Sequence, residues 1–330
     1  MIHDSERGPL KKAPFFMKRL ICLLVLAVSP AGASEPLTYY QDWFPGPQFA
    51  GLYVALDRGF YREEGVELAV HPFAFGQNVP ALMDADVSRA AIGTLEGYIL
   101  LQKRARGADL VVLNAVLRES PAGYMMLPGK SAASALDFRG KRIGVHKYGD
   151  PLYRLFLRRA GMEPSAATMV FVDDDLGRLE RGEVDFMQGY AIEELVKLRR
   201  ARPGAGFLSF RELGFDAYSQ VIFSTRGQLG SHPGALRAFI EGTRRGWAYA
   251  LAHPDAAVDA VMPRMAVGTE RALVREMFLA TGPFVASAGA PPLGPVEASK
   301  WSSMSAACVE MGLLPRAEDP AAFVVPDKGP

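Results

Sequence analysis

The sequence predicts an α/β protein of two lobes, each built around a mostly parallel sheet and joined by a two-strand hinge. Short apolar runs alternate with helical segments along most of the chain, as is typical of parallel strands covered by helices. Two breaks rich in Gly or Pro, near residues 118–124 and 214–220, interrupt this order, and the chain beyond them is largely helical. Such breaks predict two crossings between lobes, as in proteins that close over a cleft.

The first lobe is expected to comprise residues 34–121 and 219–330. Its first helix is expected to open at Pro47, because the missing N–H of proline costs nothing at a helix start. Its last long helix carries one apolar stripe opposite a charged face, which is typical of a packed surface helix. The expected strands are Leu37–Gln41, Val66–Val70, Ala90–Gly93, Leu110–Val116 and Gln220–Ser224, and the expected helices are Gln48–Tyr61, Val79–Met83, Glu96–Arg104 and Pro233–Ala252.

The second lobe is expected to span residues 122–218, after a Ser-Pro-Ala-Gly break. Asp150 precedes Pro151, a combination that indicates the N-cap of a helix. The expected strands are Tyr124–Leu127, Arg142–Val145, Thr168–Val172, Val184–Gln188 and Phe207–Phe210, with helices at Pro151–Ala160 and Glu193–Arg200.

The N-terminal segment, residues 1–33, is predicted to be a secretion signal. Lys18-Arg19 precedes the apolar stretch Leu20–Val28, and Ala31-Gly32-Ala33 follows it. This order of basic, apolar and small residues is typical of a signal peptide, and the apolar stretch is too short to span a membrane. Cleavage after Ala33 is expected. The irregular residues 1–16 suggest an upstream start codon or an added segment.

The composition of the chain excludes several classes of function. The 330 residues include 37 basic and 36 acidic side chains, so the chain has no basic field for nucleic acid. Cys22 lies in the predicted signal and lacks the small residues that precede a lipid-modified cysteine, which leaves Cys308 alone in the exported chain. Neither a disulfide nor a cysteine metal cluster is therefore expected. We expect a free periplasmic protein without a lipid anchor, metal or cofactor.

Four groups of motifs lie within residues 37–262. Each group alone is weak evidence for a family, but their order along the chain is specific. They lie at Gln41–Ala55 with Arg58–Val66, at Leu136–Val145, at Gly182–Glu194, and at Gly214–Tyr218 with His232–Pro233 and Arg245–Pro254. In this order they resemble the NMT1/THI5-like family of type II periplasmic binding proteins. The third motif departs from the family pattern, with Glu193 in place of Asn and Leu195 in place of Pro.

The resemblance implies a type II periplasmic-binding-protein fold and a non-enzymatic role. The protein would be the solute-binding component of an ABC importer, a monomer that delivers its ligand to a permease with a cytoplasmic ATPase. Family ligands include riboflavin and thiamine-precursor pyrimidines, and a small planar heterocycle of the pyrimidine kind is expected here. Two alternatives stay open: a ligand receptor for a membrane sensor kinase or cyclase, and a thiamine pyrimidine synthase.

Candidate ligand-binding residues of the first lobe follow its strands, because ligands of α/β sheets bind at the carboxyl ends of strands. Trp43 could stack on a planar ring or pack on its own lobe. Asp42 could contact the ligand or orient the loop, and Gln48 could offer its amide to a ring nitrogen. Thr94 could be a ligand contact or a plain N-cap.

In the second lobe the candidates are Tyr148, Tyr190 and Glu194. The Glu194 carboxylate could accept hydrogen bonds from an amino group of the ligand, or could complement the dipole of its helix. His146 is expected to be structural.

Catalytic groups do not cluster in the sequence, and the five histidines are scattered. The synthases of the family use an active-site histidine and a cysteine-rich stretch. The corresponding segments here, Thr94–Arg104 and Gly214–Arg226, hold no histidine and no cysteine, respectively. The sequence therefore favours a binding protein over a synthase.

Overall fold

The computed structural model describes residues 34–86, 88–147, 149–173, 175–286 and 290–326. The described residues form one compact unit. The predicted signal peptide, residues 1–33, lies outside the described residues. Within the described part of the chain, no helix combines the length and the apolar character that crossing a membrane requires.

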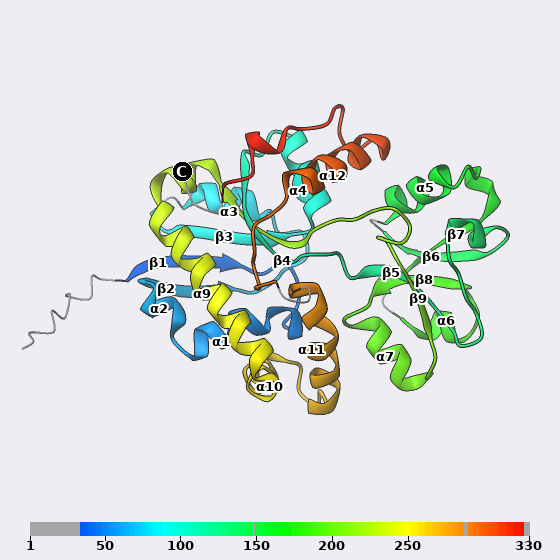
Figure 1. Cartoon of the computed structure of the whole chain (residues 1–330), viewed down its shortest axis with the longest axis horizontal. Coiled ribbons are helices and arrows are strands. Elements are labelled where there is room, and N and C mark those ends of the chain that lie inside the picture. The colour runs from blue at the N-terminus through cyan, green and yellow to red at the C-terminus, as the bar shows by residue number, and fades with distance from the viewer. Residues whose placement is uncertain (1–33, 87, 148, 174, 287–289, 327–330) are drawn as a thin grey trace, which may run out of the picture. The chain divides into compact units, whose positions relative to one another are not determined.

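The first sheet has five strands in the order β2-β1-β3-β10-β4 (Figure 1). β1 pairs in parallel with β2 and β3, whereas β10 pairs antiparallel with both β3 and β4. Four strands therefore run in one direction, and β10, which the chain forms last, runs against them. The strands are β1 (Glu35–Tyr40), β2 (Val66–His71), β3 (Ala90–Leu95), β4 (Leu110–Leu117) and β10 (Ser219–Thr225).

The second sheet repeats this arrangement in the order β7-β6-β8-β5-β9. β6 pairs in parallel with β7 and β8, and β5 pairs antiparallel with β8 and β9. In each sheet the antiparallel strand is the one that the chain forms on arriving from the other sheet. The strands are β5 (Ala122–Met126), β6 (Arg142–His146), β7 (Thr168–Val172), β8 (Phe186–Tyr190) and β9 (Gly206–Ser209). The predicted α/β class with two mostly parallel sheets is confirmed.

Helices cover both faces of the first sheet, with α1, α9, α10 and α11 on one face and α3, α4, α8 and α12 on the other. Their bounds are α1 (Ala50–Asp57), α2 (Phe60–Glu63), α3 (Val79–Ala85), α4 (Gly97–Ala105), α8 (Arg226–Ser231), α9 (Pro233–Ala252), α10 (Pro254–Val261), α11 (Arg271–Val285) and α12 (Ala298–Glu310). Short 3₁₀ turns lie at Pro47–Phe49, Met262–Arg264 and Pro320–Ala322.

Glycines allow α1 and α9 to cross closely. A Cβ atom at Gly51 would lie 2.3 Å from the Trp247 ring, and one at Gly246 would lie 2.1 Å from the Gly51 carbonyl oxygen. The helix predicted over Gln48–Tyr61 is interrupted before α2, because Gly59 adopts a left-handed φ of 76°.

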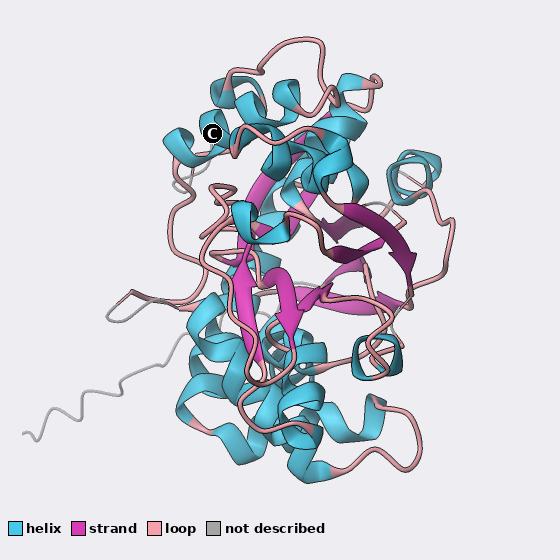
Figure 2. Cartoon of the chain, turned by 90° about the vertical axis from the view of Figure 1, so that its right-hand side faces the viewer, coloured by secondary structure: helices cyan, strands magenta, loops and turns pink. Residues whose placement is uncertain are grey.

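The second sheet carries α5 (Asp150–Arg159) on one face and α6 (Gly177–Glu180) with α7 (Glu194–Ala201) on the other. Two 3₁₀ turns, Ala135–Phe138 and Pro164–Ala166, accompany α5. The strands lie between groups of helices (Figure 2). The predicted N-cap role of Asp150 is wrong: Gly149 precedes the helix, and Asp150 is its first residue, paired with Arg154 at 2.7 Å. The carboxylate there complements the helix dipole.

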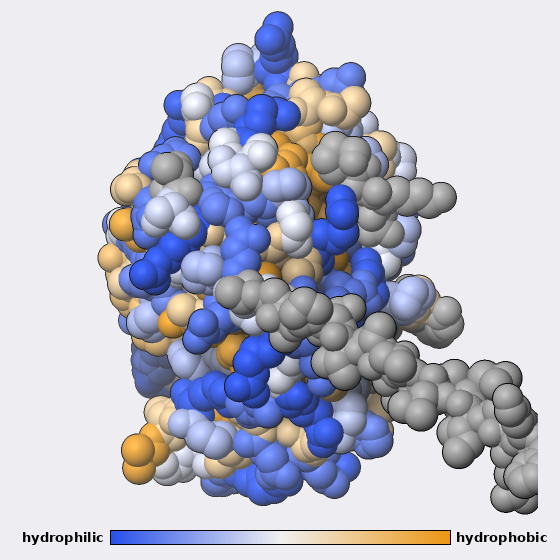
Figure 3. All heavy atoms as spheres, turned by 90° about the vertical axis from the view of Figure 1, so that its left-hand side faces the viewer, coloured by the Kyte–Doolittle hydropathy of each residue, from blue (hydrophilic) through white to orange (hydrophobic). Residues whose placement is uncertain are grey.

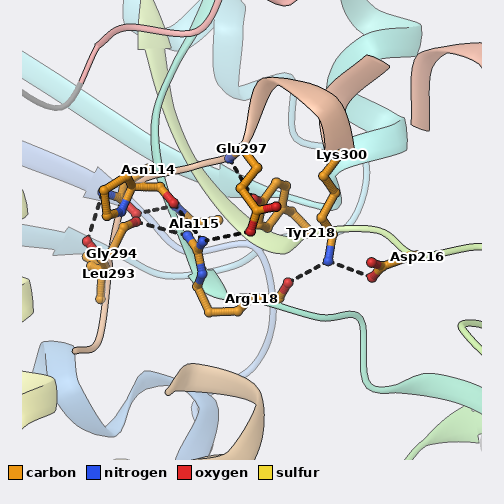
Figure 4. A network of polar contacts seen from close by, with 10 residues as sticks. Asn114, Ala115, Arg118, Asp216, Tyr218, Leu293, Gly294, Glu297 and Lys300 are labelled. Atoms are coloured by element: carbon orange, nitrogen blue, oxygen red, sulfur yellow. Dashed lines mark hydrogen bonds and ion pairs between the residues drawn. The ribbon is translucent and has the colours of Figure 1, made fainter. Parts of the chain in front are cut away.

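Two segments, residues 118–121 and 210–218, connect the sheets. Lys300 of α12 holds both, since its ammonium donates to the Arg118 carbonyl oxygen at 2.7 Å and to Asp216 at 2.5 Å (Figure 4). The Tyr218 hydroxyl accepts from the Glu297 backbone N–H at 2.8 Å. The C-terminal segment is thereby bonded to both connections.

The face seen in Figure 3 is mainly polar, with apolar side chains in small separate areas. The large exposed apolar side chains that bear on the site are Phe44 and Phe75, described below.

Candidate functional site

The loop after β1 is fixed by a buried glutamine. The Gln41 side-chain amide donates to the Trp43 carbonyl oxygen at 2.8 Å, and its oxygen accepts from the Tyr53 hydroxyl at 3.3 Å. These bonds hold the backbone of the loop, so the side chain of Trp43 is presented from a defined position at the carboxyl end of β1.

Four aromatic rings form a cluster around this loop: Trp43, Phe44, Phe73 and Phe75. The Trp43 ring centroid lies 5.6 Å from Phe44, 5.3 Å from Phe73 and 6.3 Å from Phe75. Phe44 is 50% exposed and Phe75 is 76% exposed. We call these four residues the aromatic cluster. Sequence analysis missed Phe73 and Phe75, although both directly follow β2, at the same edge of the sheet as Trp43.

The aromatic cluster borders a cleft of about 200 Å³. Its walls come from the loop after β1, from the segments after β2, β7 and β8, and from the C-terminal helical region. The lining residues are Trp43, Phe44, Pro45, Gly46, Pro47, Phe75, Leu176, Glu193, Glu194, Lys197, Met265 and Met277. Two predicted site residues, Trp43 and Glu194, are thus brought to one cavity from different sheets.

Glu194 is the first residue of α7 and folds back on its own strand. Its Oε2 accepts from the Tyr190 backbone N–H at 2.9 Å. Burial, reinforced by the neighbouring Glu193 carboxylate, raises the pKa of Glu194 to about 7. Lys197 pairs with Glu193 at 2.8 Å. The cleft wall therefore carries one paired carboxylate and one that titrates near neutrality.

Glu96, which sequence analysis missed, connects the two lobes through a hydrogen bond to Tyr190. Its Oε1 accepts from the Ser219 hydroxyl at 2.5 Å and from the Tyr190 hydroxyl at 3.4 Å. Burial raises the pKa of Glu96 to about 7. The predicted site residue Tyr190 is therefore bonded, in this structure, to a carboxyl group that follows β3. Glu96 stands at the carboxyl end of a strand, the same signal that pointed to Trp43.

Asp42 and Thr94 lie together at the first sheet. Thr94 is 1% exposed within β3, and its hydroxyl shares a hydrogen bond of 2.9 Å with the Tyr39 hydroxyl. The N-cap alternative for Thr94 is wrong, because α4 begins after Glu96. Burial raises the pKa of Asp42 to about 6, although a hydrogen bond with the Thr94 hydroxyl acts in the opposite direction and lowers it. Asp42 Oδ1 has no hydrogen-bond partner among the described residues.

Gln48 lies in the 3₁₀ turn before α1 and lines a second, narrower recess together with Thr94 and Gln220. Tyr148 lies outside the described residues. The expected structural role of His146 agrees with its contacts: its backbone N–H donates to Gln188 Oε1 at 3.0 Å, and its ring lies 3.2 Å from the Gln188 carbonyl oxygen. In the described ranges, no group of three or more His, Cys, Asp and Glu side chains is placed to hold a metal ion.

Comparison with solved structures assigns the fold. The chain is similar to the periplasmic aliphatic sulphonate binding protein SsuA from Escherichia coli, with a TM-score of 0.66 at 14% identity over 88% of this chain and 91% of that one. At that identity the likeness concerns the fold alone, and it confirms the predicted periplasmic-binding-protein fold.

Two curated relatives differ in what they do. The riboflavin-binding protein RibY from Chloroflexus aurantiacus is 27% identical over 240 residues, which are 70% of this chain and 68% of the relative. The 4-amino-5-hydroxymethyl-2-methylpyrimidine phosphate synthase of Schizosaccharomyces pombe is 24% identical over 63% of each chain. The chain thus spans somewhat less than two thirds of that synthase. The model of the family described as NMT1/THI5 like matches residues 46–257. This chain therefore belongs to the NMT1/THI5-like family.

Proposed function

We propose that this protein is the periplasmic solute-binding component of an ABC importer and binds a small planar heterocycle, a thiamine-precursor pyrimidine, in the cleft. The observation that carries the proposal is the aromatic cluster, which lies on the same cavity as Glu193 and Glu194 of the other lobe. Such an arrangement offers a ring face for stacking and carboxyl groups for the polar edge of a ring.

The size of the cleft favours one ring over several. About 200 Å³ is smaller than the roughly 300–1,000 Å³ that is typical of sites for drug-sized molecules. A substituted pyrimidine suits this volume better than the three fused rings of a flavin, although one relative is named for binding riboflavin.

The polar groups suit an amino-substituted ring. With a pKa of about 7, Glu194 accepts a hydrogen bond when ionised and can donate one when protonated. A hydrogen bond between an amino group and a carboxylate is charge-assisted and stronger than a neutral one. An aminopyrimidine carries an amino donor beside a ring-nitrogen acceptor, and a carboxyl group such as that of Glu194 can bond to either.

The cleft favours binding over catalysis. Its lining residues include neither histidine nor cysteine. Burial raises the pKa of the Cys308 thiol to about 12, so this cysteine is a poor nucleophile at neutral pH. Closure over the ligand, recognised by the importer's permease, is the proposed mechanism, and the ligand shifts the equilibrium through better contacts in the closed form. The protein is proposed to act as a monomer.

Calorimetric titration of the purified protein tests the proposal, with the free aminopyrimidine, riboflavin and an alkanesulfonate as ligands. The pyrimidine is expected to bind most tightly. Trp43→Ala and Glu194→Gln should each raise its Kd about tenfold, through lost stacking and a lost charge-assisted hydrogen bond.

Matched controls lie away from the cleft: Phe171→Ala removes an aromatic side chain of a residue that is 57% exposed on β7, and Glu67→Gln removes a glutamate charge on the exposed side of β2. Both should bind like the unaltered protein. Unchanged affinity in Trp43→Ala and Glu194→Gln, with normal melting, would mean that the ligand is held elsewhere.

A further inference from the structure

A narrow recess of about 10 Å³ lies at the start of β10. Aromatic rings of Tyr39, Phe239 and Trp247 form part of its wall, and its polar side chains are those of Gln48, Thr94, Gln220 and Thr243, whose hydroxyl is already bonded to Tyr61 and to the Phe239 carbonyl oxygen. The recess holds at most one water-sized group, because a single water needs about 10–15 Å³ measured in this way. A hydroxyl or an amino group fits it, whereas a ring does not.

Gln220 is the unusual residue of this recess. Its side chain is 5% exposed, and neither Oε1 nor Nε2 has a hydrogen-bond partner among the described residues. Buried amides nearly always find partners, so an amide with both atoms unpaired indicates a missing one. A primary amide can both donate and accept, which matches a hydroxyl or an amino group.

The backbone holds this amide in place at a conformational cost. Gln220 has a φ of 45°, in the left-handed region that residues other than glycine rarely adopt. Its neighbours secure it: Ser219 donates to Glu96 at 2.5 Å, and Val221 pairs with Leu95 and Ala115 of the adjacent strands. Backbone strain of this kind persists where surrounding contacts enforce it, and it concentrates at ligand sites.

The recess and the cleft share one loop. Gly46 and Pro47 line the cleft, and the next two residues, Gln48 and Phe49, line the recess. The Gln48 side chain, which lines the recess, lies close to Gly46, which lines the cleft, since a Cβ atom on Gly46 would lie 3.4 Å from Gln48 Oε1. The loop that separates the recess from the cleft is therefore short, and the subsite proposed below requires that a ring held against it extend a short substituent past Gln48 toward Gln220.

We propose that the recess is a subsite that receives one hydroxyl or amino substituent of the bound ring, and that Gln220 is the residue that selects for it. This proposal rests on the proposed function, because it requires a planar ligand in the cleft. It adds the requirement that the ligand carry a small polar substituent.

The test compares three probes by calorimetry: the free aminopyrimidine with its hydroxymethyl group, an analogue with methyl in place of hydroxymethyl, and an analogue without the amino group. The unaltered protein should bind the first probe about tenfold more tightly than the analogue that lacks the group entering the recess, whether that group is the hydroxyl or the amino group. Gln220→Met keeps the length of the side chain without its amide and should reduce that preference to less than twofold. Gln220→Asn tolerates the left-handed backbone but is too short to reach, and should lose the preference as well.

Gln228→Met is the matched control. Gln228 is also buried, but its amide is bonded to Ala91, Met83 and Asp86, away from both cavities. It should lower the melting temperature and keep the preference. A Gln220→Met or Gln220→Asn protein that folds and keeps the full preference would overturn the subsite, as would an unaltered protein that binds all three probes equally.

The two proposals fail in different ways. If the probes bind the unaltered protein and Trp43→Ala weakens them while Gln220 variants keep the preference, the subsite is wrong and the proposed function stands. If none of the three pyrimidines binds, the pyrimidine assignment and the subsite are both wrong.

Discussion

At the scale of single residues, three carboxyl groups near the cleft share one property. Burial raises the pKa of Asp42 to about 6, and those of Glu96 and Glu194 to about 7. Each lies in a place where the ionised form is poorly solvated. They therefore titrate close to neutrality, where a carboxyl group can serve either as donor or as acceptor.

The raised pKa of Glu96 predicts a pH-dependent stability. Its ordinary value is 4.5 and its folded value is about 7, so between these values the folded protein holds a proton that the unfolded chain has lost. The stability that this proton contributes is full below pH 4.5 and is lost as the pH rises through 7. The loss is on the order of 3 kcal/mol.

Glu96→Gln removes the titration while keeping a neutral, hydrogen-bonding side chain. The melting temperature of the unaltered protein should fall by a few degrees between pH 5 and pH 8, and that of the variant should fall less. Thermal melts over this pH range measure the difference. Equal pH profiles of the two proteins would contradict a buried, titrating Glu96.

At the scale of elements, the crossing of α1 and α9 depends on two glycines that face each other. No side chain fits between Gly246 and the Gly51 carbonyl oxygen, since a Cβ atom would approach it to 2.1 Å. Backbone cannot move aside as a flexible side chain can, and overpacking of this kind typically costs about 1–3 kcal/mol.

Gly246→Ala should therefore destabilise the protein by about 3 kcal/mol, as measured by urea unfolding. Gly234→Ala is a control in the same helix, because a Cβ atom there meets nothing within 4 Å. It should be neutral or stabilise by up to about 1 kcal/mol, through better helix propensity. Equal effects of the two changes would mean that the helices have room to separate.

At the scale of the whole chain, the two sheets share one strand order, and the segments between them are bonded to the C-terminal region. Lys300 is central to this contact, because its ammonium reaches both segments and also lies 4.6 Å from the Tyr218 ring centroid. One side chain thus contacts both connections, residues 118–121 and 210–218, alongside the bonds that Arg118 and Tyr218 make to residues 294–297.

Lys300→Met should loosen both connections together. Charge-assisted bonds to the Arg118 carbonyl oxygen and to Asp216 are lost, and the half-exposed Asp216 limits the effect to about 1 kcal/mol. Amide hydrogen exchange in residues 118–121 and 210–218 should become severalfold faster. Lys141→Met, an exposed lysine of the second lobe, is the control and should change neither segment. Faster exchange in one segment alone would contradict a shared restraint.

The amino-acid sequence by itself determined the class of fold, the places of the strands along the chain, and the family, but not the positions of helices such as α6, α8 and α10. Those properties depend on neighbours close in the chain. A short, nearly continuous apolar run marks a buried strand such as β4. Pro233 followed by an apolar stripe marks α9, whose predicted bounds agree with the structure. The loop after β1 was also recognisable, because Trp43 stands directly after a strand and before Pro45.

Tertiary structure alone decided which side chains meet. Glu96 lies 94 residues from Tyr190 and 123 residues from Ser219, and no local pattern records such contacts. Likewise, whether the Gln220 amide finds a partner depends on distant strands and helices, and within the described ranges it has none. Hydrogen bonding and burial are properties of the packed surroundings, which the chain acquires only when remote segments come together, and so they were decided by the fold.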